Sequence, residues 1–206
     1  MDVAADLVPG WLEVAAALLL AALLGRAVRR VARLRALPSP HLVGALAVAM
    51  GLLWAAKVTP MPGFAVHLTG APLALVAVSA GALLAVGFGA MPWEMAALQA
   101  LLHGALPVMV SCACLAASER WLGTHLFVYL LGVAFFGTSV AVIVAGVVST
   151  TLAVALGLPV PPDAWIALVP VGYAEAFVTG GLTTVMVVYR PQWVATFDDA
   201  RYLRRP

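Results

Sequence analysis

A short polar stretch at residues 64–72 lies between two long apolar blocks of the sequence. His67 is followed there by Thr69, Gly70 and Pro72, so an imidazole and a hydroxyl stand next to two residues that interrupt helices. Neutral imidazole is a common protein ligand for late first-row transition metals. We therefore predict that His67 is the centre of a metal site, with Thr69 as a secondary candidate. The alternative is a loop histidine at the outer membrane interface that binds a backbone carbonyl.

A second imidazole, that of His103, lies in the middle of an apolar block at residues 93–117. A histidine inside a membrane span is costly and usually faces the protein interior, so we predict a functional role for it. On a helix, Cys114 would share its face about three turns later, while Met109 and Cys112 are spaced i, i+3. Sulfur and imidazole together suit Cu(I), which makes copper handling an alternative. Methionine and cysteine are also ordinary packing residues in apolar helices.

Glu175 is the third candidate, about ten residues into an apolar block at 165–189. A carboxyl group at such a depth either pairs with a cation or holds a proton. It could support His67 or His103 by a hydrogen bond, orient a ligand or relay protons. A structural hydrogen bond to a neighbouring helix explains it equally well.

The composition shows which solvent these residues meet. The 206-residue chain is 64% hydrophobic and 10% charged, with a mean hydropathy of +1.07, whereas a soluble domain carries about a quarter charged residues. Lipid must therefore cover much of its surface. We predict an all-α polytopic protein of a bacterial-type inner membrane, with one transmembrane domain over residues 1–206. Because no nucleotide-hydrolysis, protease or paired CxxC motif is present, we expect no enzyme.

Six apolar blocks punctuate the chain, at about 11–28, 41–56, 73–89, 93–117, 126–158 and 165–189. Arginines gather after the first block and after the last (Arg26, Arg29, Arg30, Arg33, Arg35; Arg190, Arg201, Arg204, Arg205). Arginine clusters next to spans mark cytoplasmic loops. We therefore predict an outer N-terminal segment at 1–10, with no cleavable signal peptide, and an interfacial tail at 190–206. No soluble domain presents these arginines, so no nucleic-acid partner is expected.

The number of crossings depends on two stretches. Pro60 and Pro62 exclude a helix over residues 58–63, so we predict a loop that inserts into the bundle at His67. Residues 126–158 would extend roughly 50 Å as one helix, more than a hydrocarbon core of about 30 Å. We favour two short crossings here. The prediction is thus a bundle of six or seven transmembrane helices, and seven would place both arginine clusters inside.

Three segments, in order, resemble a known family over about residues 40–191. Val66-His67-Leu68-Thr69-Gly70 resembles the "SxHxxG" segment of CbiM/NikM-type proteins, and residues 98–104 (LQALLHG) resemble their "QA-L--GG" helix. Residues 174–180 (AEAFVTG) resemble their "EG-LTG" helix, which an Arg-Pro pair follows, as it does here at 190–191. These proteins are the substrate-capturing membrane components of nickel and cobalt energy-coupling-factor transporters.

The resemblance implies a six- or seven-helix bundle that binds a divalent metal near the outer face. It also implies a second transmembrane coupling protein and cytoplasmic ATPases as partners. In the family, a Met-His start supplies ligands beside the loop histidine; this chain starts Met1-Asp2-Val3, so only His67 carries over. Asp2 could supply an oxygen ligand instead. The better match is a divergent branch of predicted permeases.

The leading hypothesis from the sequence is a membrane component of a nickel- or cobalt-like uptake system, in which His67, His103 and Glu175 handle the metal. Copper handling through Met109, Cys112, Cys114 and His103 is one alternative. Another is a non-transporting membrane subunit or assembly factor, in which the same polar residues only hold helices together.

Overall fold

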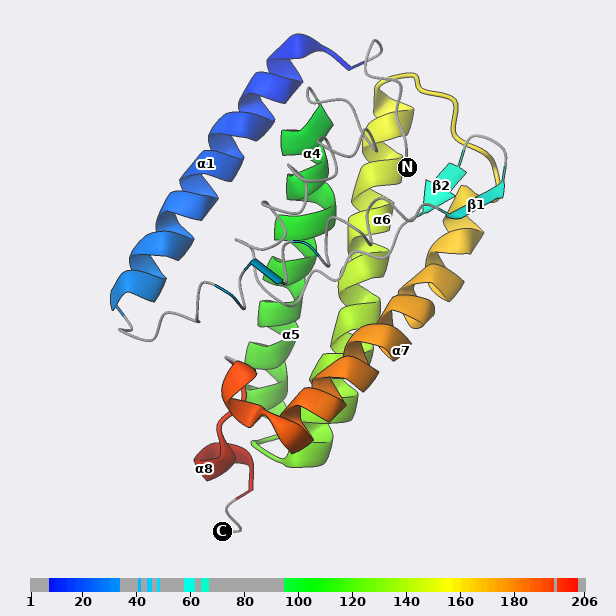
Figure 1. The fold of residues 1–206 in the computed structure, drawn as a ribbon. Helices are drawn as coiled ribbons and strands as arrows, with labels where there is room; N and C mark the ends of the chain where they lie inside the picture. The colour runs from blue at the N-terminus through cyan, green and yellow to red at the C-terminus, as the bar shows by residue number, and fades with distance from the viewer. Residues whose placement is uncertain are drawn as a thin grey trace.

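The structure is a computed structural model that describes residues 8–33, 41, 44–45, 48, 58–61, 64–66, 95–194 and 196–203. Within these ranges the protein is predominantly helical (Figure 1). In chain order its elements are α1 (Gly10–Arg33), β1 (Val58–Met61), β2 (Phe64–Val66), α4 (Ala96–Ala100), η4 (Leu101–Ala105), α5 (Leu106–Trp121), η5 (Val128–Gly137), α6 (Thr138–Ala155), α7 (Ala164–Tyr189), η6 (Pro191–Trp193) and α8 (Asp199–Tyr202).

Three helices in the described part of the chain are long and apolar enough to cross a membrane. They comprise Ala96–Trp121, Val128–Ala155 and Ala164–Tyr189, with 26, 28 and 26 residues. Many of their large apolar side chains point outward; Phe177 and Val188, for example, are 69% and 66% exposed. A soluble protein would bury such residues, whereas lipid solvates them. The structure therefore supports a helical membrane protein.

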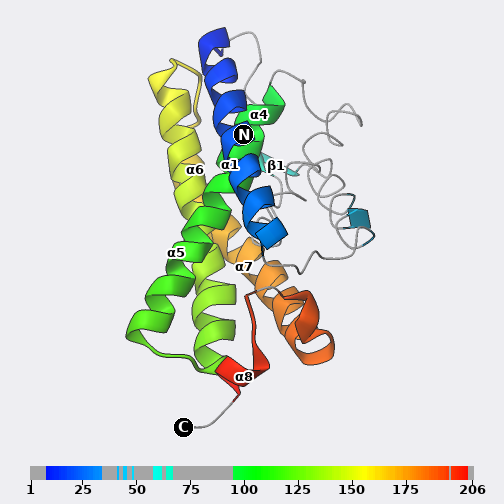
Figure 2. The ribbon, with the colours of Figure 1, turned by 90° about the vertical axis from the view of Figure 1, so that its left-hand side faces the viewer.

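These three helices form the centre of the fold, with the η5–α6 helix between the other two. The α4–α5 helix and α7 both run antiparallel to η5–α6 and pack against it (Figures 1 and 2). Glycines allow α7 to approach closely: a Cβ atom at Gly172 would lie 2.6 Å from Ile143 Cγ1, and one at Gly180 would lie 3.3 Å from the Ala134 carbonyl oxygen. Small residues at a helix interface have this role in membrane bundles.

Helix α1 lies against the start of the α4–α5 helix (Figure 2). Val8 and Ala16 pack there on Met95 and Leu98, and all four side chains are buried. The helix continues past the predicted apolar block to Arg33, so its last turns belong to the arginine cluster. It is not among the three helices that are apolar enough to span.

One prediction about the crossings is wrong. Residues Val128–Ala155 form a single continuous helix of about 42 Å rather than two short crossings. Its first ten residues are π-helical. The glycines at which a bend was expected do not interrupt the helix. Among the described residues three spans are found, and the blocks at 41–56 and 73–89 lie largely outside them.

Residues 58–61, which include Pro60, are not helical, as predicted. They form β1, which pairs antiparallel with β2, with Val58 opposite Val66 and Met61 opposite Phe64. The C-terminal tail folds as two short helices, η6 and α8, under one end of the bundle (Figure 1). Helix α1 starts at the opposite end of the bundle and ends about level with its middle (Figures 1 and 2). The end with η6 and α8 carries Arg190 and Arg201, and we refer to it as the arginine-bearing end.

Candidate functional site

His103 lies in a π-helical turn inside the first long helix. The turn, η4, comprises residues Leu101–Ala105 and is followed directly by α5, where Pro107 is in the first turn. Proline has no backbone N–H to donate to the carbonyl of His103, and its ring would clash with that carbonyl in a regular α-helix. The wider turn relieves this conflict. Single π turns of this kind are frequent at functional sites.

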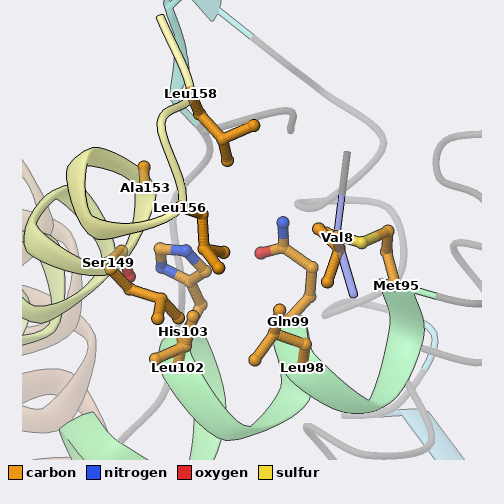
Figure 3. A pocket seen from close by; sticks show the side chains of 11 residues that line it. Val8, Met95, Leu98, Gln99, Leu102, His103, Ser149, Ala153, Leu156 and Leu158 are labelled. Carbon is orange, nitrogen blue, oxygen red and sulfur yellow. The ribbon is translucent and has the colours of Figure 1, made fainter. Parts of the chain in front are cut away.

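The imidazole of His103 lines a small cavity of about 20 Å³. Figure 3 shows that the amide of Gln99 points into the same space, with Ser149 of α6 on the other side. The Ser149 hydroxyl donates to the Ala145 carbonyl at 2.8 Å, so its oxygen can still accept. A cavity of this size has room for about one water molecule. The rest of the lining is aliphatic or thioether (Val8, Met95, Leu98, Leu102, Leu152, Ala153, Leu156, Leu158).

Glu175 is almost completely buried on α7, with 1% of its surface exposed. The Thr179 hydroxyl, one turn later, donates to Glu175 Oε1 at 3.3 Å. Thr183 continues the row on the same face of the helix, and both threonines are buried. The spacing of four residues produces this row. The carboxyl group and the two hydroxyl groups thus lie along one buried face of α7.

The sulfur residues predicted for copper lie elsewhere on the long helix. Met109 and Cys112 are exposed, and Cys114 is half-buried. Cys114 does face η5–α6, as His103 does, because its Cβ atom lies close to Gly137. The two residues are nevertheless about 16 Å apart along the helix, and ligands of one metal lie about 2.0–2.3 Å from it. The structure therefore does not bring His103 and Cys114 to one ion.

The remaining predicted ligands, His67, Thr69 and Asp2, lie outside the described residues. Within the described ranges, no group of three or more His, Cys, Asp or Glu side chains could hold a metal ion. A metal site that uses His103 or Glu175 must therefore draw ligands from the rest of the chain or from a partner.

Nothing in the sequence marks Ser149 as a neighbour of His103, because only the packing of α6 on η4 brings the two residues together. Thr179 and Thr183 could have been found from their spacing relative to Glu175. Comparison with protein-family models, curated proteins and solved structures found no match to this chain.

Proposed function

We propose that this protein is the membrane component of an uptake system for a divalent transition metal, with nickel and cobalt as the candidates. One observation carries the proposal: an apolar bundle turns an imidazole, a primary amide and a hydroxyl toward one internal cavity, at His103, Gln99 and Ser149. Polar side chains at membrane depth are costly, and they typically mark substrate or ion pathways. Neutral imidazole and oxygen donors suit a borderline divalent ion.

The position of the cavity along the bundle fits capture from outside. It lies where the α4–α5 helix begins and α6 ends, toward the start of α1 and away from the arginine-bearing end (Figure 1). By the positive-inside rule, the arginine-bearing end is cytoplasmic. We place the N-terminus outside a bacterial-type inner membrane on this basis. The start of α1 and helix α8 lie at opposite ends of the bundle (Figure 1). An odd number of membrane crossings between them therefore fits better than six.

In this proposal His67 is the first ligand and His103 the inner one, while Glu175 provides the compensating negative charge or accepts a proton deeper in the bundle. A second transmembrane coupling protein and cytoplasmic ATPases are the expected partners. The exposed apolar faces of α5 and α7 provide surface for such a membrane partner as well as for lipid.

The test is the metal content of the gently purified protein. We expect stoichiometric Ni²⁺ or Co²⁺ after loading, a loss of most of it in His67→Ala, and a clear loss in His103→Ala. His125→Ala is the matched control, because His125 is exposed in the turn after α5, where its Nδ1 accepts from the Phe127 N–H at 3.1 Å. Equal metal in all four proteins, or a preference for Cu(I) in competition, would rule out this function.

A non-transporting subunit or assembly factor is the second candidate. The hydrogen bond from Thr179 to Glu175 favours it, because it satisfies part of the carboxyl group within α7 itself. This candidate predicts no bound metal and a loss of thermal stability in His103→Ala and Glu175→Ala. It also predicts a stable partner in a pull-down from the native membrane.

A further inference from the structure

A second cavity lies on the opposite side of Thr179 from Glu175, toward the arginine-bearing end of the bundle. Its volume is about 140 Å³, and it is bounded by α5, η5, α6 and α7. Six of its lining residues carry hydroxyl groups (Ser111, Tyr129, Thr138, Thr179, Thr183, Thr196). None of its lining residues carries a formal charge.

The chemistry of this cavity indicates that it contains water. The Ser111 hydroxyl oxygen is buried and finds no hydrogen-bond partner among the described residues. Buried polar atoms are rarely left unsatisfied, and an ordered water is the usual partner when there is room for one. The volume suffices for several water molecules. An apolar bundle would otherwise fill such a space with aliphatic side chains.

The C-terminal cap (residues 191–194 and 196–203) closes this cavity from below. Trp193, Val194 and Thr196 contribute to its lining, and the Thr196 hydroxyl lies 2.6 Å from the Tyr129 hydroxyl. Phe197 stacks on Tyr202 at 5.4 Å between ring centroids, and both rings pack on Tyr129. The cap thus rests on the bundle through one aromatic cluster.

Glu119 at the end of α5 attaches the cap from the other side. It accepts from Arg201 at 2.8 Å and from the Tyr202 hydroxyl at 2.5 Å. Arg201 is half-exposed, so its ion pair contributes little by itself. The bond from the buried Tyr202 hydroxyl to a carboxylate is charge-assisted and stronger. Together with the contact between Thr196 and Tyr129, these bonds hold the cap against the bundle.

We propose that the hydroxyl-lined cavity is a water-filled chamber that connects the arginine-bearing end of the bundle to Glu175 through Thr179. In this proposal the C-terminal cap controls access to the chamber, and its contacts with Glu119 keep it closed. The chamber gives water, and with it protons or small hydrated ions, access to a carboxyl group that is otherwise buried. It is separate from the His103 cavity. The role of the chamber therefore goes beyond metal capture and can be tested without metal.

A cysteine at position 111 is the reporter, because the Ser111 hydroxyl is buried and lines the chamber, whereas Cys112 is exposed. The probe is a small, charged thiosulfonate applied to the full-length Ser111→Cys protein in lipid nanodiscs, in a Cys112→Ser, Cys114→Ser background. Thiosulfonates react with thiolates in water and not with thiols in lipid. We expect slow labelling of this parent and roughly ten-fold faster labelling after Glu119→Gln, a ratio that corresponds to a weakening of the cap by the strength of one charge-assisted contact.

Two controls distinguish opening of the cap from a general loosening of the bundle. Arg120→Gln changes the neighbouring exposed charge and should label like the parent, and Arg201→Lys keeps an ion pair and should stay close to it. The variant with Cys112→Ser and Cys114→Ser but with Ser111 intact should not be labelled. Failure of Ser111→Cys to react both in the parent and after Glu119→Gln overturns the chamber, and equal rates in both overturn the role of Glu119 in holding the cap.

Ser111→Ala gives a second readout that does not depend on the cap. If the cavity were dry, the unpartnered hydroxyl would be a cost, and its removal would raise the thermal stability of the protein. If water fills the cavity, the substitution removes a hydrogen bond, and the stability stays unchanged or falls. A stabilised Ser111→Ala protein would refute the water-filled chamber even if the labelling results stood.

Discussion

The adjacent glycines of α7, Gly180 and Gly181, should respond to the same substitution with opposite signs. A Cβ atom at Gly180 would meet the Ala134 carbonyl oxygen and the Phe135 Cα and Cδ2 atoms, all at 3.3 Å. Two of these three are backbone atoms that cannot rotate away. A Cβ atom at Gly181 would have no heavy atom within 4 Å in the described residues. The two residues therefore differ only in which face of α7 they occupy.

The expected sizes follow from two opposing effects. Alanine stabilises a helix relative to glycine by about 0.5–1 kcal/mol, and Gly181→Ala should gain up to that amount. Gly180→Ala has the same gain but must push α7 away from η5 by a few tenths of an ångström, and overpacking of this kind typically costs about 1–3 kcal/mol. We therefore expect Gly180→Ala to be less stable than Gly181→Ala by about 1–3 kcal/mol.

Reversible unfolding in mixed micelles, followed by circular dichroism, measures this difference directly. The two variants have the same composition, so effects of hydrophobicity cancel between them. Equal stabilities, or a more stable Gly180→Ala protein, would show that α7 does not pack on η5 as described. The same result would remove the basis for placing Thr179 and Thr183 against the chamber.

Three further predictions concern the polar groups. Glu175→Gln keeps a hydrogen-bond acceptor for Thr179 and should change the free energy of unfolding by less than about 1 kcal/mol, yet it should abolish metal accumulation in cells; normal accumulation would assign Glu175 to structure alone. The pKa of Tyr202 is raised above its ordinary value of about 10, because the ring is buried and because Glu119 accepts its hydrogen bond and repels a phenolate. The folded protein therefore favours the neutral phenol. This contribution to the stability of the fold is complete below about pH 10 and is lost as the pH rises through the higher pKa of the folded state. Tyrosinate absorbance of the wild type minus that of Tyr202→Phe should show this late titration. Pro107→Ala should let η4 relax toward a regular α-helix and reorient His103, which a lower metal content at unchanged helicity would reveal.

The long helices of the second half of the chain were predictable because local signals agree there. Helix α7 begins and ends within a residue of the apolar block read from the sequence, since Asp163 precedes it and Arg190-Pro191 ends it. The fate of residues 126–158 was not predictable from length alone. A span longer than the hydrocarbon core can tilt or extend beyond it, and this segment does not split into two crossings.

The candidate site was predictable only in part, for a similar reason. His103 and Glu175 stand out because imidazole and carboxyl groups are rare in apolar blocks. Ser149 does not, because a hydroxyl that bonds the carbonyl four residues earlier is ordinary in membrane helices. Its position opposite His103 depends on the register between α6 and η4. The π turn had a local signal, Pro107, but the sequence does not say whether a proline kinks a helix or widens it.

The two cavities are lined by different parts of α6. Ser149 lines the His103 cavity and Thr138 lines the hydroxyl chamber, and about 16 Å of helix separates these residues. Small buried side chains occupy the interval, with Ala141 and Ala145 exposed by 0% and 1%. A pathway with access from each side would need a packed barrier between two such cavities. The proposed uptake function therefore predicts this distribution, whereas a role limited to holding helices together does not require it.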